Sequence, residues 1–260
     1  MTDWLELCRA ATADVRAVLA ELPGRAEREP VVGAGEGGDD TTAVDEAAER
    51  VVLERFRGLG TIVSEEAGEV GEGAVRIVVD PIDGSLNAKR GLPHFALSIA
   101  VAEGPTVADV FLGYVYDFGW DEEWTAVRGE GARLNGEPLG PQRPKGEIEV
   151  LSFEATLTSS VAEQAASMVG LAYRLRILGS LALSLCQLAA GRLDGVVSLK
   201  PIRSVDVAAA QLLVREQGLA VELVDEPPFL AAPLDVVSRS RIAAAGTPEL
   251  CRKLANALSA

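Results

Sequence analysis

The segment VRIVVDPIDGSLN, residues 75–87, is the most informative stretch of this chain. Its first half is rich in β-branched residues and predicts a buried strand. The strand runs directly into two acids, a proline and a glycine, and Ser85 then begins a predicted helical turn. Because Pro81 fixes one backbone angle and Gly84 permits a tight turn, both carboxylates and the Ile82 carbonyl can converge on one point.

A loop of this composition offers a site for a metal and a site for an anion. Hard cations such as Mg²⁺ select carboxylate and carbonyl oxygens, keep some waters, and bind phosphate oxygens in the remaining positions. If Ser85 begins a helix, the backbone N–H groups of Gly84 and Ser85 face outward, where a phosphate can be held. The same residue types also form ordinary capped turns, so this segment alone leaves both interpretations open.

Further acids occur at the predicted ends of other elements. Glu65 and Glu66 end a predicted strand in TIVSEE, residues 61–66. Asp206 begins a predicted helix, and Asp45 lies early in another. Taken singly, each acid has a simpler explanation, as an exposed loop end, an N-cap or a solvated helix position.

The rest of the first half is predicted to be helical and then antiparallel. Residues 3–22 carry apolar side chains at helical spacing, whereas the glycine-rich acidic segment 29–42 predicts an exposed, mobile loop without regular structure. A second helix is predicted over residues 43–56. A hairpin turn at Asn135-Gly136 closes a sheet of three extended segments, at residues 94–104, 108–117 and 122–131.

Beyond the Pro/Gly-rich stretch at 138–147, the pattern changes to alternating strands and helices, which predicts an α/β second half. The predicted strands are at residues 148–153, 173–178, 195–199, 220–224 and 239–246. The predicted helices are near residues 160–169, 180–190, 206–217 and 248–258.

Composition narrows the possible partners. The 260-residue chain has a formal net charge of −15, which disfavours binding to nucleic acid or to anionic lipid. Clustered carboxylates that hold metal ions would give such an acidic protein a positive site for phosphate.

Cys8, Cys186 and Cys251 lack paired spacing, so neither disulfides nor a zinc site is expected. With no basic leader and no apolar run of about 20 residues, we expect a cytoplasmic protein.

Taken together and in this order, the motifs resemble those of the inositol monophosphatase family. They are the acidic loop, SEE at 64–66, DPIDGS at 80–85, GSLALSLCQLAAGRLDG at 179–195 and SVDVAAA at 204–210. NAKRGLPHFALSIA, GYVYD and YRLRILGS are similar to the archaeal-type branch, which acts on inositol monophosphate and fructose 1,6-bisphosphate. The resemblance implies a layered αβαβα sugar-phosphatase fold, α+β in residues 1–142 and α/β in residues 143–260.

The resemblance also assigns roles to residues. Two or three Mg²⁺ ions, with Mn²⁺ as a substitute, would be bound by Glu65, Asp80, the Ile82 carbonyl, Asp83, Asp206 and, for a weaker third ion, Asp39. Asp45 with Ser85 would orient and help to deprotonate the attacking water, beside the catalytic acids Glu65 and Asp83. Substrate contacts would come from Gly84, Ser85, Gly179, Ser180 and Asp206, with Arg90, Arg174, Arg176, Lys200 and Arg203 as basic candidates. For each basic residue a surface salt bridge is the alternative.

The activity implied is Mg²⁺-dependent hydrolysis of a small sugar or polyol phosphate by activated water, in a homodimeric enzyme. His94, the sole histidine, lies in an apolar strand start and is expected to be structural. Ser85 stands where the family usually has threonine, and Val205 where it usually has tryptophan, so substrate fit can differ. The alternatives are a 3′-phosphoadenosine 5′-phosphate phosphatase, a histidinol phosphatase, and a regulator that binds phosphosugars without turnover.

Overall fold

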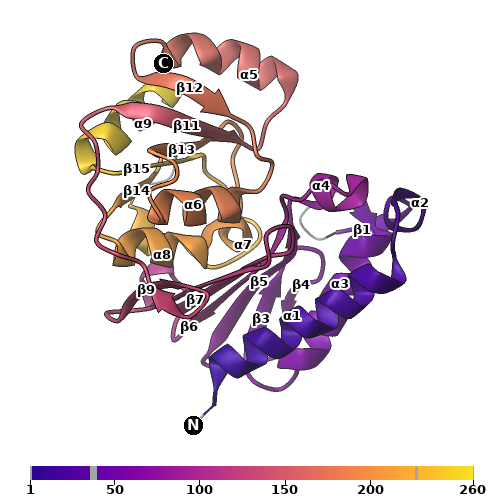
Figure 1. The fold of residues 1–260 in the computed structure, drawn as a ribbon. Helices are drawn as coiled ribbons and strands as arrows, with labels where there is room; N and C mark the ends of the chain where they lie inside the picture. The colour runs from indigo at the N-terminus through magenta and orange to yellow at the C-terminus, as the bar shows by residue number, and fades with distance from the viewer. Residues whose placement is uncertain (1, 36–39, 226–227, 260) are drawn as a thin grey trace.

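The computed structural model describes residues 2–35, 40–225 and 228–259. Within these ranges the strands form a small hairpin and two larger sheets. Helices and sheets stack in five layers, in the order helix, sheet, helix, sheet, helix (Figure 1). This is the αβαβα layering expected from the sequence.

The first sheet has the strand order β10-β9-β8-β7-β6-β5-β3-β4, and it is antiparallel except for the parallel pair β3 and β5. Helices α1 and α3 pack on its outer face (Figure 1). The strands are β3 (Thr61–Ser64), β4 (Gly68–Val70), β5 (Arg76–Asp83), β6 (Ala96–Ala102), β7 (Val110–Asp117), β8 (Glu122–Val127), β9 (Gly131–Leu134) and β10 (Glu137–Pro138). The first-half helices are α1 (Trp4–Glu21), α2 (Arg25–Arg28), α3 (Ala43–Phe56), α4 (Ser85–Arg90) and the 3₁₀ turn η1 (Val107–Asp109).

The second sheet has the order β12-β11-β13-β15-β14, with β11 parallel to both of its neighbours. Its strands are β11 (Ile148–Glu154), β12 (Ala172–Arg176), β13 (Gly195–Ser198), β14 (Ala220–Leu223) and β15 (Ile242–Ala245). The second-half helices are α5 (Thr158–Ala165), α6 (Leu181–Ala189), α7 (Ser204–Val207), α8 (Ala210–Glu216), α9 (Pro248–Ser259), η2 (Ala166–Met168) and η3 (Phe229–Ala231). The split at residues 142/143 falls between β10 and β11 and stays a prediction.

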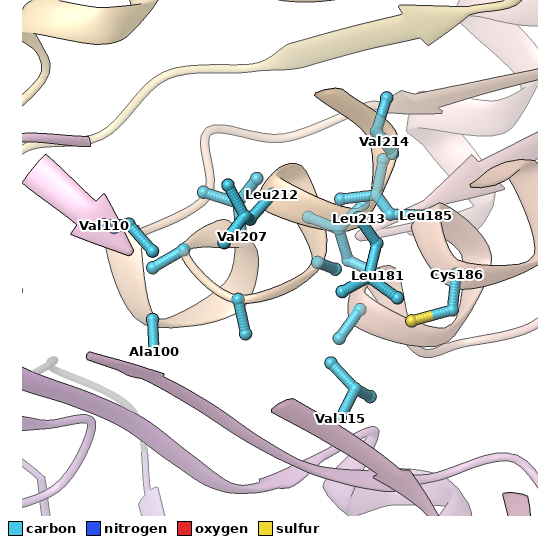
Figure 2. Close-up of a cluster of buried hydrophobic side chains, with 14 of the residues drawn as sticks. Ala100, Val110, Val115, Leu181, Leu185, Cys186, Val207, Leu212, Leu213 and Val214 are labelled. Carbon is cyan, nitrogen blue, oxygen red and sulfur yellow. The ribbon is translucent and has the colours of Figure 1, made fainter. Parts of the chain in front are cut away.

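The main apolar core lies where α6 and α8 are enclosed between the two sheets. In Figure 2, Val115 of β7 points toward Leu181 and Cys186 of α6, and Leu213 of α8 lies beside Leu185. All five side chains are buried. Burial of this apolar area, worth about 25 cal/mol per Å², holds the two halves of the chain together and so fixes the loops between them.

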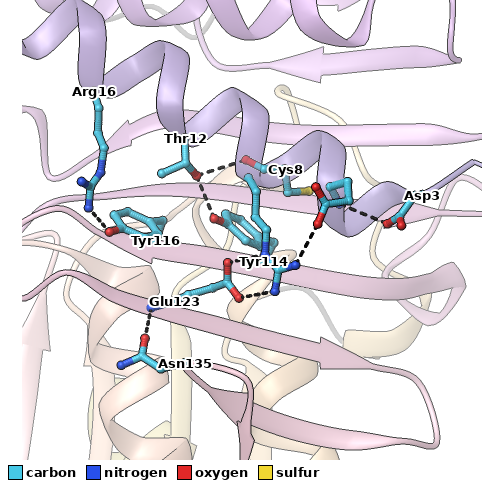
Figure 3. A network of polar contacts seen from close by, with 10 residues as sticks. Asp3, Cys8, Thr12, Arg16, Tyr114, Tyr116, Glu123 and Asn135 are labelled. Carbon is cyan, nitrogen blue, oxygen red and sulfur yellow. Dashed lines mark hydrogen bonds and ion pairs between the residues drawn. The ribbon is translucent and has the colours of Figure 1, made fainter.

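Helix α1 is joined to the first sheet by polar contacts as well as by its apolar face. Asp3 caps the helix by accepting from the Glu6 N–H at 3.1 Å. Thr12 Oγ1 lies 2.8 Å from the Tyr114 hydroxyl on β7 (Figure 3). Arg9 donates through two nitrogens to Glu123 on β8, at 2.9 Å each. The register of α1 on the sheet is therefore specified by polar groups.

Most predicted elements are confirmed, and the helix predicted over 43–56 has the same bounds in the structure. Two predictions are wrong. The segment 29–42 is not without regular structure, because β1 (Val31–Ala34) and β2 (Asp40–Thr42) pair as an antiparallel hairpin. The helix predicted over 206–217 is two helices, α7 and α8. Among the described residues, no helix is both long enough and apolar enough to cross a membrane.

Candidate active site

The end of strand β5 is irregular at its two acids, because its pairing with β6 shifts register between Asp80 and Asp83. Asp80 is buried, and its Oδ1 accepts a hydrogen bond from the Ile82 N–H at 3.0 Å. The Ile82 carbonyl accepts from Ser85 Oγ at 3.1 Å, and α4 begins at Ser85 as predicted. The segment therefore places carboxylates and one backbone carbonyl at the same end of the strand.

Gly84 allows two loops to meet next to these acids. Its φ is +90°, and a Cβ there would lie 2.9 Å from the carbonyl oxygens of both Gly179 and His94. Asn87 Nδ2 bridges the same loops by donating to the His94 and Leu178 carbonyls, at 2.7 and 2.8 Å. Residue 84 must be glycine because of both its backbone conformation and this close approach.

Asp83 is held at the start of α6. Its Oδ2 accepts hydrogen bonds from the Ser180 hydroxyl and, at 2.7 Å, from the Ala182 N–H. Ser180 is also the N-cap of α6, accepting from the Leu183 N–H at 3.3 Å. A negative charge is stabilised at a helix N-terminus, so α6 fixes and stabilises this carboxylate.

Arg203 connects the remaining two acids. Its guanidinium forms an ion pair with Glu65, which follows β3. Its backbone N–H donates to Asp206 Oδ2 at 2.7 Å, within the first turn of α7. The loops that carry Glu65 and Asp206 are thereby joined through one residue.

Glu65, Asp83 and Asp206 open onto one pocket of about 680 Å³ between the two halves of the chain. The other predicted residues of this segment and of the α6 start do not line it, namely Asp80, Ile82, Gly84, Ser85 and Ser180. Acids and bases line it together, an arrangement able to hold a cation and an anion side by side. The lining residues are Glu65, Asp83, Leu86, Asn87, Glu154, Ala155, Thr156, Gly179, Leu181, Lys200, Pro201, Ile202, Arg203, Asp206 and Arg239.

Burial, and then the negative charge of neighbouring acids, raises the pKa of Glu65, Asp80 and Asp83. Burial, followed by the negative charge of Asp206, raises the pKa of Glu65 to about 8. Burial raises the pKa of Asp83 to about 7, with Asp206 adding to the effect and the Ser180 hydroxyl opposing it. Burial and the nearby charge of Glu65 also raise the pKa of Asp80. A cluster of buried acids that repel one another is the electrostatic setting that a bound cation stabilises.

The donor set fits a hard divalent cation, because carboxylates and a backbone carbonyl supply the oxygen ligands that such a cation selects. Across residues 2–35, 40–225 and 228–259, no three His, Cys, Asp or Glu side chains are grouped closely enough to hold a metal as they stand. Arg203 instead supplies the positive charge beside Glu65. Asp45 Oδ1 is buried without a hydrogen-bond partner in the described structure, which leaves a carboxylate oxygen for a water or an ion.

The structure does not bring every predicted residue to the pocket. Arg90, on the last turn of α4, pairs with Glu29 at 3.3 Å. Arg174 and Arg176 lie on the edge strand β12, and Arg176 faces a different cavity beside Trp120. These three arginines are therefore not gathered with the acids, whereas Lys200 and Arg203 are.

Two further predictions concern the pair Asp45 and Ser85, and the third-metal residue Asp39. Asp45 and Ser85 are not hydrogen-bonded to each other, because Asp45 Oδ2 accepts from the Thr42 N–H and hydroxyl while Ser85 donates to Ile82. Their joint role toward water stays a prediction. Asp39 lies outside the residues that the structure describes.

The sequence reasoning missed Glu154, which lines the pocket. This carboxylate is buried, with Oε1 accepting from Ser152 Oγ at 2.7 Å and Ser184 Oγ at 2.6 Å, and Oε2 accepting from the Gly179 N–H at 2.9 Å. Burial raises its pKa. The available signal was that Glu154 ends a buried strand, as the predicted acids do.

Fold and pocket together define a layered α/β protein whose acids and bases meet between its two halves. A sequence model of the Inositol monophosphatase family matches residues 3–260. The chain belongs to the inositol monophosphatase family, a family of metal-dependent phosphomonoesterases.

Known proteins agree with this assignment. A "Fructose-1,6-bisphosphatase/inositol-1-monophosphatase" of Thermococcus kodakarensis is 36% identical over 219 residues, covering 83% of this chain and 82% of the relative. "Nus factor SuhB" of Escherichia coli is 38% identical over 194 residues, covering 69% and 70%. The crystal structure of an inositol monophosphatase-fructose 1,6 bisphosphatase gene product matches with a TM-score of 0.86 at 26% identity, covering 98% of this chain and 100% of that one. The fold is thus the sugar-phosphatase fold of this family.

Proposed function

We propose that this protein is a Mg²⁺-dependent phosphatase that hydrolyses a small sugar or polyol phosphate, inositol 1-phosphate or fructose 1,6-bisphosphate. The observation that carries the proposal is the pocket that Glu65, Asp83 and Asp206 line from three distant parts of the chain. Lys200 and Arg203 line the same pocket and suit the phosphate group of a substrate.

Glu65, Asp80, Asp83, Asp206 and the Ile82 carbonyl are the proposed metal ligands. When bound, Mg²⁺ would supply Lewis acidity to the phosphoryl group and to the attacking water. Asp39 is the proposed contributor to a third, weaker site, and Mn²⁺ a substitute for Mg²⁺.

The chain's own residues orient the reacting groups. Ser180 and Ala182 hold the Asp83 carboxylate at the start of α6, so its direction is set before substrate binds. Asp45, with one buried unpaired oxygen, is the proposed acceptor of a proton from water, and Ser85 the group that orients that water. Gly84, Gly179 and Ser180 form the proposed wall against phosphate or substrate hydroxyls.

The direct experiment measures phosphate release from inositol 1-phosphate, fructose 1,6-bisphosphate, 3′-phosphoadenosine 5′-phosphate and histidinol phosphate, with and without Mg²⁺. We expect Mg²⁺-dependent release from one or both of the first two. Asp83→Asn keeps the size of the side chain but removes the ligand charge, so turnover should be lost while the protein stays folded. Glu130→Gln, at an exposed turn, is the control that should keep full activity.

The last two of these substrates represent the alternative phosphatases, and preferential release from either would replace the proposed substrate class. A regulator without turnover is the alternative outside enzymes. Mg²⁺ binding without phosphate release from any of the four substrates would favour it and would contradict the proposed activity. Cytoplasmic location and a homodimeric state belong to the same proposal, and light scattering after gel filtration tests the dimer.

A further inference from the structure

Glu49 is a buried carboxylate on α3 that does not line the pocket, as far as the described residues show. Its Oε1 accepts three hydrogen bonds, from Ser64 Oγ at 2.5 Å, from the Glu66 N–H at 3.1 Å and from the Ala67 N–H at 3.0 Å. These donors lie on both sides of Glu65. One oxygen therefore ties down the whole turn that presents Glu65.

The turn needs such a partner. Strand β3 ends at Ser64 and β4 begins at Gly68, so residues 65–67 lie between two strands. The Glu66 and Ala67 N–H groups are partly buried, where an N–H without an acceptor is costly, and a carboxylate is a strong acceptor for them. A buried carboxylate is in turn unfavourable unless several donors satisfy it. Each side therefore stabilises the other, and the turn is attached to a helix of 14 residues.

Glu49 contacts the 65–67 turn from α3, not from the pocket. Arg203 pairs with the Glu65 side chain from the pocket side, whereas Glu49 holds the Glu65 backbone neighbours from the α3 side. A carboxylate ligand is useful only if its backbone is fixed, because metal geometry tolerates little displacement.

We infer that Glu49 is a positioning residue for divalent-cation binding, which fixes the 64–67 turn so that Glu65 points into the pocket. The inference rests on the proposed function and adds a residue to it. Glu49 acts through hydrogen bonds to the turn, not as a ligand and not as a distant charge.

The test is the affinity for Mg²⁺, measured by calorimetry on the full chain, for Glu49→Ala, Glu49→Gln and the control Glu46→Gln. Loss of an outer partner of a metal ligand weakens binding about tenfold or more, which we expect for Glu49→Ala. Glu49→Gln keeps an acceptor oxygen and should stay within about threefold of the wild type. Glu46 is an exposed acid on the same helix, and its variant should bind like the wild type.

The two glutamate variants separate positioning from charge. If the negative charge of Glu49 merely attracted the cation, Glu49→Gln and Glu49→Ala would lose the same affinity. That outcome would overturn the inference, as would an unchanged affinity in Glu49→Ala. Thermal unfolding in EDTA checks that each variant is folded.

Ser64→Ala keeps the inference testable if Glu49→Ala does not fold. It removes one donor to Glu49 and should weaken Mg²⁺ binding about threefold, and an unchanged affinity would count against the inference. A wild-type protein that binds no Mg²⁺ would overturn the proposed function together with this role. A wild type that binds Mg²⁺ and releases phosphate, beside a Glu49→Ala variant of equal affinity, would overturn the positioning role alone.

Discussion

Arg203 forms an ion pair with Glu65 across 138 positions of sequence, joining the loop before α7 to the turn after β3. The Arg203 side chain is only 5% exposed and that of Glu65 is 21% exposed, so both charges are largely removed from water. A buried charge requires a partner, and here the guanidinium provides for Glu65 the positive charge that we propose a metal provides during catalysis.

Replacement of Arg203 by Gln should affect stability and metal binding in opposite directions. In EDTA, at a pH above the Glu65 pKa of about 8, the free energy of unfolding should fall by about 3 kcal/mol, because the ionised Glu65 loses its charged partner. Mg²⁺ should bind several-fold more tightly, because the Arg203 guanidinium no longer competes for Glu65. Chemical denaturation and calorimetry measure the two effects. Arg128→Gln, which breaks the exposed pair with Glu103, should change neither, and a weaker Mg²⁺ affinity in Arg203→Gln would contradict the prediction.

The metal-free protein should lose stability as pH rises. An acid whose pKa is higher in the folded state binds its proton more readily when folded, so the free energy of unfolding decreases through the interval between the two pKa values. That interval runs from 4.5 to about 8 for Glu65 and from 3.8 to about 7 for Asp83.

Thermal unfolding in EDTA should therefore show a falling melting temperature between about pH 5 and about pH 8. Asp83→Asn cannot titrate at this position, so its curve should be flatter. Saturating Mg²⁺ should raise the melting temperature most at the alkaline end. A wild-type melting temperature that rises across this range in EDTA would contradict the assignment of raised pKa values.

The packing of Gly84 against Gly179 and His94 predicts a large effect of a single methyl group. Gly84→Ala places a Cβ 2.9 Å from two carbonyl oxygens at a φ of +90°, and should cost about 2–4 kcal/mol of stability. Gly91, at the other end of α4, has a φ of +70° and open space around it, so Gly91→Ala should cost only about 1 kcal/mol. Equal losses in denaturant titrations would mean that the close approach does not matter.

Glu154 should be structurally essential although it belongs to the pocket wall. Glu154→Ala leaves the Ser152 and Ser184 hydroxyls and the Gly179 N–H without their acceptor. Each unsatisfied buried group is costly, so the free energy of unfolding should fall by about 2–4 kcal/mol. Glu149→Ala, on the exposed side of the same strand, should leave the free energy of unfolding nearly unchanged, as chemical denaturation can show. A loss as small as that of the control would contradict this role.

Sequence patterns predicted correctly those strands and helix starts that neighbouring residues specify. The β-branched strand before Asp80 and the helix start at Ser85 are confirmed in the structure, because both are specified within the segment 75–87. The predicted turn is shorter than expected, since β5 continues through Asp83 and only Gly84 separates it from α4. The hairpin at Val31–Ala34 was missed because glycine-rich composition hides backbone pairing with Asp40–Thr42, which only the fold supplies.

The site residues that the sequence did not predict correctly depend on contacts between residues that are distant in the sequence. Glu154 meets Ser184 of α6 and Gly179 of the loop before that helix, and no spacing in the sequence reveals this. Arg90 was expected at the substrate, yet its place on the last turn of α4 directs it to Glu29. A basic side chain near an acidic motif in sequence can thus belong to a surface ion pair.

We propose that Glu65, Asp80, Asp83 and Asp206 jointly hold divalent cations. The anomalous diffraction of crystals soaked in Mn²⁺ tests this, because it marks the metal position without reference to activity. We predict anomalous peaks beside these four acids, with the Arg203 guanidinium moved away from Glu65. Peaks elsewhere, or an Arg203–Glu65 pair still intact at saturating Mn²⁺, would contradict the proposed metal site.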